Sequence, residues 1–366
     1  VAKMAAKFNE GHRIQLEGHK LMYHVDEVSR WLKGETVAPI YVEIGPINAC
    51  NHKCVFCALD YIKSKGAMID KKAMINTLKN MADFGVKSIM FAGEGEPLAY
   101  PFIAEAVDKA KEYGLDIAIT TNGVLLDEKK AESILENISW IKFSIDAGTR
   151  ETYAKVHRCS PDDFDKVMKN IKSACEHRKK NGLKCAIGCQ ILLIPSNINE
   201  VEKLILKVKE LGVDYLVLKP YSQHPNSINK LVLDLKKNDN DSKLTGLSKK
   251  HSTAHFKVIY RNISAQEVER KQCDYDKCHG LNFFALVDAS GNIIPCNLFY
   301  EKPEYYYGNI NRNTFEEIWN SRKRKEILEK LYGKGCENCR KGCRLNFVNK
   351  YLDAVKNRNI EHINFI

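Results

Sequence analysis

Three cysteines at fixed spacing constrain this chain more than any other feature. Cys50, Cys54 and Cys57 form a C-x3-C-x2-C loop just after the apolar, β-branched run 40–44, which predicts a strand. Soft thiolates select iron–sulfur clusters or zinc over hard cations. Three thiolates in one loop can hold three irons of a cubane [4Fe–4S] cluster, leaving the fourth iron for the amino and carboxylate groups of a small molecule. A zinc knuckle, or three cysteines packed as small hydrophobic residues, is the alternative.

The loop, with Phe56 just before its last cysteine, resembles the signature of the radical S-adenosylmethionine (SAM) superfamily. The resemblance implies that the open iron binds the methionine end of SAM and that one electron from the cluster splits the sulfonium. The resulting 5′-deoxyadenosyl radical takes a hydrogen atom from an unactivated carbon. The resemblance also implies a partial (β/α)6 barrel.

Composition points away from several other classes. No run of about 18 apolar residues occurs and the first residues have no signal-peptide core, so we expect a cytoplasmic protein that makes no use of a membrane. The net charge of +11 would suit nucleic acid, but no nucleic-acid fold motif is present and many lysines fall on amphipathic helices. Thirteen cysteines without a secretion signal indicate metal clusters rather than disulfides.

Short apolar runs alternate with helical patterns from residue 40 onwards. Six such units predict an α/β fold, with a parallel sheet, helices outside it, and an open rather than a closed barrel. The strands are expected at 40–44, 87–91, 116–121, 140–145, 184–193 and 215–219, and the helices at 71–84, 102–113, 128–135, 162–180 and 198–211. Ligands of such sheets bind at the carboxyl ends of the strands.

We divide the chain into five parts. They are an N-terminal extension (1–38), the barrel (39–225), a bridging segment whose polar start is taken as a loop or flap (226–265), a small α+β cysteine-rich domain (266–350) and a tail (351–366).

The expected strand ends carry the candidate SAM contacts. Gly95-Glu96-Pro97 follows the second strand, where glycine allows close backbone approach and Glu96 can accept from an ammonium group. The family carries Gly-Gly-Glu-Pro here, and Glu94 stands in place of the first glycine. By the same resemblance we assign further SAM contacts to Phe56, Thr121, Asn122, Ser144 and Asp146. Ordinary turn and N-cap chemistry is the alternative for these polar side chains.

Candidate substrate contacts lie on the fifth and sixth strands. They are Gln190, on the fifth strand, and Lys219, Tyr221, Gln223 and His224, in a proline-fixed turn at the end of the sixth. A purely structural turn is the alternative.

A second cysteine-rich stretch follows. Cys278, a strand–turn–strand pattern and Cys296 predict a hairpin with a cysteine at each base, and a helix over 314–332 leads to Cys336-x2-Cys339-x3-Cys343. This stretch resembles the SPASM or shorter twitch domain of radical SAM enzymes. A zinc ribbon is the alternative.

The six cysteines of this stretch are too few for two fully ligated cubanes, so we expect one auxiliary [4Fe–4S] cluster. The expected ligands are Cys278, Cys296, Cys339 and Cys343, with Cys273 and Cys336 as substitutes.

Segments 92–98, 146–153 and 219–224 resemble radical SAM proteins found with sugar or polysaccharide biosynthesis. The resemblance implies hydrogen abstraction from a carbon of a sugar or nucleotide sugar. A thiol then quenches the radical, giving epimerisation, or the auxiliary cluster oxidises it, giving dehydrogenation. Cys273 and Cys336 are the candidate hydrogen donors. An electron donor such as flavodoxin or ferredoxin is the expected protein partner.

Two other functions stay open. Many SPASM proteins mature ribosomally made peptides, usually with an N-terminal peptide-binding domain of roughly 80–100 residues, whereas only about 38 residues precede the expected barrel. A non-catalytic iron–sulfur electron carrier or zinc-binding scaffold is the other alternative.

Overall fold

A computed structural model of the chain describes residues 19–63, 66–231, 237–262, 273–336, 339–357 and 361–365. One curved sheet runs through the molecule, with strand order β10-β9-β8-β1-β2-β3-β4-β5-β6-β7. Its first seven strands lie parallel in chain order. They are β1 (Tyr41–Ile44), β2 (Ser88–Phe91), β3 (Asp116–Thr121), β4 (Trp140–Ser144), β5 (Ala186–Leu193), β6 (Tyr215–Pro220) and β7 (Lys257–Tyr260).

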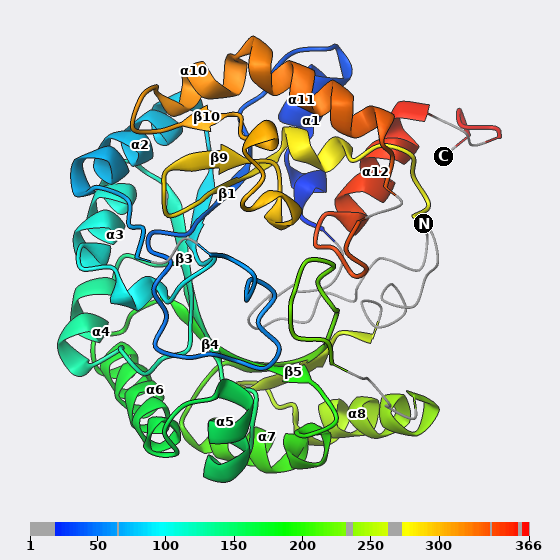
Figure 1. The fold of residues 1–366 in the computed structure, drawn as a ribbon. Helices are drawn as coiled ribbons and strands as arrows, with labels where there is room; N and C mark the ends of the chain where they lie inside the picture. Colours follow the sequence, from blue (N-terminus) through cyan, green and yellow to red (C-terminus); the bar gives the residue numbers. More distant parts are fainter. Residues whose placement is uncertain are drawn as a thin grey trace.

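The partial barrel predicted from the sequence is confirmed. Strands β1 to β6 lie where the apolar runs placed them, and helices cover the outer face of the curved sheet (Figure 1). These helices are α2 (Lys71–Phe84), α3 (Ile103–Glu112), α4 (Glu128–Ile134), α5 (Arg150–His157), α6 (Asp162–Lys180) and α7 (Val201–Glu210). Helix α5 was not predicted; Thr149 caps it by accepting from the Thr152 amide.

Side chains alternate between the helices and the barrel interior along each strand. On β4, Ile141 and Phe143 are fully buried in the core under the helices, whereas Lys142 and Ser144 face the interior and stay partly exposed. The interior is therefore the polar, accessible side of the sheet, where a ligand can lie.

The cysteine-rich part joins the barrel sheet instead of standing apart from it. Strand β8 (Phe284–Val287) pairs in parallel with β1, and β9 (Asn292–Ile294) and β10 (Gly308–Asn309) continue as antiparallel strands. The predicted hairpin is thus β8–β9. Figure 1 shows α1, α10, α11 and α12 gathered around this end of the sheet. They span α1 (Val25–Leu32), α10 (Phe315–Asn320), α11 (Arg322–Gly333) and α12 (Asn346–Asn357).

Two sequence expectations were wrong. The helix expected over 314–332 is two helices, because Ser321 has extended backbone angles and its hydroxyl caps α11 at the Arg324 amide. The polar stretch taken as a loop contains α8 (Lys237–His251). Only Leu244 and Leu247 of its described side chains are buried apolar residues, too few to reveal a helical period.

The remaining short helices are 3-10 turns: η1 (Leu21–Tyr23), η2 (Pro97–Ala99), η3 (Ile198–Glu200), η4 (His279–Asn282), η5 (Asn297–Phe299) and η6 (Pro303–Tyr305). Within the described ranges, no helix is both long enough and apolar enough to cross a membrane. The first 18 residues and the expected boundary at 265/266 lie outside the described residues.

Candidate active site

The cysteine loop lies at the carboxyl edge of β1, held from two sides by distant segments. On one side the Lys53 amide donates to the carbonyl of His157, at the end of α5 (3.0 Å). On the other, the Ser227 hydroxyl donates to the Cys57 carbonyl (3.2 Å). The loop is therefore fixed by segments that follow β4 and β6.

The three thiols of this loop lie close together. Burial raises the pKa of Cys50 to about 11 and also raises the pKa values of Cys54 and Cys57, and neighbouring thiolate charges add to the shift at Cys50 and Cys54. Such thiols become thiolates readily only next to a cation. Three converging soft sulfurs thus fit the cubane cluster that the spacing suggests.

Glu96 is the centre of a buried hydrogen-bond network beside this loop. Its Oε1 accepts from the Thr121 hydroxyl (2.5 Å) and the Leu98 amide (3.0 Å), and its Oε2 accepts from the Asn122 amide (2.8 Å). Asn122 in turn donates from Nδ2 to Oδ1 of Asn51, inside the cysteine loop (2.7 Å). One acceptor position remains on Oε2, enough for a single donor of a ligand.

The glycine-rich turn that carries Glu96 approaches the cysteine loop very closely. A Cβ atom on Gly95 would lie 2.2 Å from the Ile47 carbonyl oxygen, so only glycine fits there. Pro97, also assigned to SAM, is buried at the start of η2.

Glu94, which replaces a glycine of the family motif, points away from this turn. Its Oε1 accepts from the Ala289 amide in the turn between β8 and β9 (2.7 Å). The departure from the motif thus links the barrel to the cysteine-rich part and leaves Gly95 in place.

Ser144 and Asp146 lie where β4 ends. Asp146 has a left-handed φ of 41°, its Oδ1 accepts from the Leu192 amide (2.5 Å), and its buried Oδ2 has no hydrogen-bond partner among the described residues. His157 lies between Asp146 (Nε2 to Oδ2, 3.7 Å) and Cys54 (Nδ1 to Sγ, 3.2 Å). Burial lowers the pKa of His157 to about 3, so this ring is neutral. Phe56 packs edge-on against it, with ring centroids 5.7 Å apart.

The predicted substrate contacts separate into two groups. Tyr221 donates to Gln223, whose own amide donates to the carbonyls of His224 (3.2 Å) and Asn229 (3.0 Å), so these side chains already hold the segment after β6. Burial lowers the pKa of His224 to about 4, and its ring stacks on Tyr61. The roles of these three residues in substrate binding stay predictions.

Gln190 and Lys219 belong to the interior instead. Gln190 is buried and alternates with Cys189 and Ile191, which lie in the outer core. Lys219 lines a cavity of about 90 Å³ between the barrel and the cysteine-rich part. The cavity is lined further by Ser222, Arg261, Asn297, Arg340 and Arg344, and by the two cysteines Cys296 and Cys343.

The four cysteines assigned to an auxiliary cluster lie near one another. Burial raises the pKa of Cys278, and the thiolate charges of Cys343, Cys296 and Cys339 raise it further. The Asn349 amide donates to the Cys278 sulfur (3.2 Å). This arrangement agrees with the assigned set, which remains a proposal.

Cys273 and Cys336, the proposed hydrogen donors, lie close to this set but outside the cavity. The Cys273 sulfur is 3.8 Å from the Cys336 carbonyl oxygen, and the Cys336 sulfur is 3.9 Å from that of Asp276. Neither is among the residues that line the cavity. Their role as donors to a substrate therefore stays a prediction.

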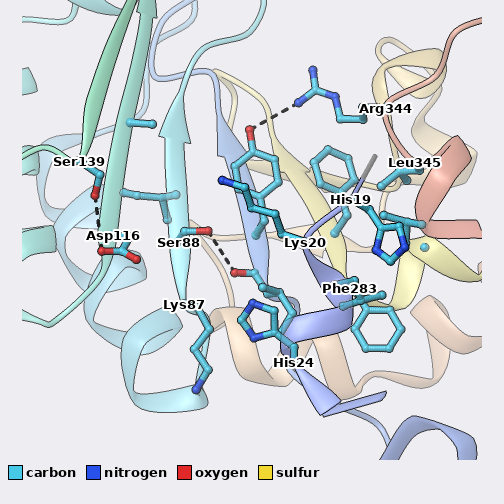
Figure 2. A pocket seen from close by; sticks show the side chains of 18 of the residues that line it. His19, Lys20, His24, Lys87, Ser88, Asp116, Ser139, Phe283, Arg344 and Leu345 are labelled. Carbon is cyan, nitrogen blue, oxygen red and sulfur yellow. Dashed lines mark hydrogen bonds between the residues drawn. The ribbon is translucent and has the colours of Figure 1, made fainter. Parts of the chain in front are cut away.

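A larger cavity, about 580 Å³, opens at the opposite end of the barrel. Figure 2 shows Ser88, Asp116 and Ser139, at the amino ends of β2 to β4, on one side of it and His24 and Phe283 on the other. Sites of barrel enzymes lie at the carboxyl ends of the strands. The smaller, polar cavity next to the cysteines is therefore the candidate active site.

Sequence reasoning missed several side chains of this site. Lys142 stands out only as a charge inside an apolar strand, and Arg340 and Arg344 each directly follow a cysteine. These were the available signals. No local pattern pointed to Arg261.

Two family models match the chain. The model of the radical SAM superfamily matches residues 44–216, and that of SPASM, an iron–sulfur cluster-binding domain, matches residues 278–344.

Relatives of known name cover most of the chain. The tungsten-containing aldehyde ferredoxin oxidoreductase cofactor-modifying protein of Pyrococcus furiosus is 25% identical over 301 residues, which are 77% of this chain and 80% of that protein. A probable GTP 3′,8-cyclase of Saccharolobus islandicus is 28% identical over 256 residues, which are 68% of this chain and 80% of that protein.

Solved structures share the fold. Streptococcus suis SuiB bound to S-adenosylmethionine has a TM-score of 0.65 and 18% identity, covering 86% of this chain and 72% of SuiB. SuiB bound to its precursor peptide SuiA has a TM-score of 0.64 and 17% identity, covering 89% and 76%. Native anSMEcpe with bound AdoMet has a TM-score of 0.57 and 20% identity, covering 87% and 96%. The chain thus carries a radical SAM domain at residues 44–216, which implies a [4Fe–4S] cluster with SAM, and a SPASM domain at residues 278–344, which implies auxiliary iron–sulfur clusters.

Proposed function

We propose that this enzyme abstracts a hydrogen atom from a peptide or protein substrate that enters between the barrel and the SPASM domain. The observation that carries the proposal is the polar cavity, which has Lys219 of the barrel on one side and Cys296 and Cys343 of the SPASM domain on the other. SuiB, which shares the fold, is known with its precursor peptide. The proteins described above include none named for a sugar, so a peptide replaces the sugar as the leading substrate.

The chain's own residues position the cofactor. When bound and reduced by a donor such as flavodoxin or ferredoxin, the cluster and SAM supply the 5′-deoxyadenosyl radical. Glu96 offers its remaining acceptor position to the SAM ammonium group, and Thr121 and Asn122 hold the Glu96 carboxylate in place. We place the reaction in the cytoplasm.

A nucleotide sugar is the second candidate, and one observation favours it. The cavity is basic, with Lys219, Arg261, Arg340 and Arg344 in its wall against the one carboxylate of Glu43, which suits a phosphate-bearing small molecule. With such a substrate the outcome is epimerisation or dehydrogenation.

Substrate-dependent cleavage of SAM tests both candidates. Anaerobically reconstituted enzyme is reduced with dithionite and given SAM with either peptides encoded next to its gene or a panel of nucleotide sugars. We expect peptides to raise 5′-deoxyadenosine formation above the substrate-free rate and to change mass. Stimulation by a nucleotide sugar alone would replace the peptide proposal. No 5′-deoxyadenosine under any condition would contradict radical chemistry itself.

Deuterium incorporation from D2O shows the fate of the substrate radical. Turnover in D2O that leaves deuterium in the product supports quenching by a thiol, for which Cys273 and Cys336 are the proposed donors. Loss of two hydrogens without deuterium uptake supports oxidation through the auxiliary cluster, for which we propose Cys278, Cys296, Cys339 and Cys343 as ligands.

A further inference from the structure

Four cations converge on the barrel interior, away from the network around Glu96. Lys142 lies in the middle of β4, Lys219 near the end of β6, Arg261 directly after β7, and Arg340 in the SPASM domain. We call these four side chains the interior cation cluster.

Several observations place the members of this cluster near one another. Lys219, Arg261 and Arg340 line the same cavity. Lys142 faces the interior from the neighbouring part of the sheet, because its sequence neighbours Ile141 and Phe143 point into the outer core. The charges of Lys142, Arg261 and Arg340 all act on Lys219. Three of the four cations thus line one cavity, and Lys142 faces the same barrel interior close enough for its charge to act on Lys219.

The two lysines of the cluster lack compensating partners. Among the residues that the structure describes, the ammonium group of neither Lys142 nor Lys219 has a hydrogen bond or an ion pair; the Lys142 ammonium lies 5.7 Å from the Trp140 ring centroid. The carboxylate that acts on both is Asp146. Arg344, which also lines the cavity, is paired with Glu43, the carboxylate of the cavity wall. Positive charge therefore exceeds negative charge in the interior.

Burial and the neighbouring cations lower the pKa of Lys219 to about 7 and that of Lys142 to about 8. Partly buried ammonium groups that face other cations are costly unless an anion joins them. Lysine offers a compact charge and arginine a planar fork, both suited to the oxygens of a carboxylate or phosphate. The cavity, about 90 Å³, holds roughly three water volumes, which is room for such a group but not for a whole substrate.

We propose that the interior cation cluster binds an anionic oxygen group, carboxylate or phosphate, of the substrate and so fixes the position of the reacting carbon. The inference rests on the proposed function and adds to it the chemical class that the substrate must carry: an acidic or phosphorylated residue in a peptide, or the phosphate of a small molecule.

Calorimetric titration of the anaerobic holoenzyme with SAM already bound tests this site. The probes are inorganic phosphate and acetate, which separate the phosphate from the carboxylate source. We expect at least one of them to bind, and Lys219→Gln and Lys142→Gln each to weaken that binding roughly 10- to 100-fold, as loss of a charged hydrogen bond does. Lys219→Arg, which keeps the positive charge, should retain most of the affinity for the anion.

The matched control is Lys79→Gln, because Lys79 is an exposed lysine on α2 paired with Asp83. It should leave binding unchanged. Equal weakening by the control, or none by the interior variants with intact iron content and melting temperature, would overturn the proposal. So would binding that occurs only without SAM, since the cluster would then serve the SAM carboxylate.

The test needs no turnover, so its outcome is separate from that of the proposed function. If the anions bind but no peptide raises SAM cleavage, the anion site stands and the peptide substrate is contradicted. If peptides raise SAM cleavage but no anion binds, the peptide substrate stands and the anion site is contradicted.

Discussion

The two sides of the barrel mouth differ in how completely their polar groups are paired. On the side of β1 to β3, Glu96 accepts three hydrogen bonds from its own chain, and Asn122 ties this network to the cysteine loop. On the side of β4 to β7, Lys142 and Lys219 find no such partners among the described residues. We propose that the first side, whose polar groups are already paired, holds SAM, and that the second, with its unpaired lysines, meets an anionic group of the substrate.

The largest effect should come from removing a thiol on the cofactor side. Cys54→Ala should abolish SAM cleavage and reduce the iron content by about four atoms per chain, because one ligand of the cubane is lost. Iron analysis and 5′-deoxyadenosine assays measure both. Cys175→Ala, on the outer helix α6, is the control and should change neither. If Cys54→Ala still cleaved SAM, the cysteine loop would not hold the cluster, and the side of β1 to β3 would not be the cofactor side.

Crowding the turn beside that loop should have the next largest effect. In Gly95→Ala the new methyl carbon would lie 2.2 Å from a backbone oxygen of residue 47, so the cysteine loop must shift. We expect lower iron content and SAM affinity reduced at least about 100-fold. Gly246→Ala is the matched control, because no atom within 4 Å would meet its Cβ. It should leave SAM binding intact and stabilise α8 by up to about 1 kcal/mol.

A smaller loss should follow when the charge at the centre of the network is removed. Glu96→Gln keeps the shape but replaces one of the two acceptor oxygens with an NH2 group, which cannot accept from the donors that face it. Affinity for SAM should fall roughly 10- to 100-fold, the cost of one unsatisfied buried group. Binding of SAM to reconstituted protein measures it, with the exposed Glu132→Gln as control. An unchanged affinity would mean that Glu96 serves only the fold.

The contact between the two domains should show the smallest effect on catalysis but a clear one on stability. Burial raises the pKa of Glu94 from 4.5 to about 8. The folded state therefore keeps a proton that the unfolded state releases, and this contribution to the free energy of unfolding is lost as pH rises from about 4.5 to about 8. Glu94→Gln stays neutral and lacks this pH-dependent loss. Between pH 4.5 and pH 8 its free energy of unfolding should therefore fall by roughly 2–5 kcal/mol less than that of the parent enzyme.

Melting curves between pH 5 and pH 9 measure this difference, again with Glu132→Gln as control. Parallel curves for Glu94→Gln and the parent enzyme would show that the Glu94 carboxyl titrates normally, against the buried link to Ala289.

Local sequence patterns mark the cofactor side, whereas none marks the interior cation cluster. Short local signals, the cysteine loop and the Gly-Glu-Pro turn, lie at strand ends, and neighbouring parallel strands bring their carboxyl ends to one edge. The interior cation cluster has no such signal. Its members come from β4, β6, the end of β7 and the SPASM domain, each as a single charge in an unremarkable local sequence.

By itself, the sequence determined the strands β1 to β6 and most of the helices between them, the partial barrel and the kind of cluster the cysteine loop suits, because periodicity and ligand spacing are properties of short segments. Only the tertiary structure decided that β8 joins the barrel sheet beside β1, that Glu94 reaches the SPASM hairpin, and that cations far apart in the chain face one cavity. Such contacts depend on how the curved sheet brings distant segments of the chain together, and no local pattern encodes that geometry.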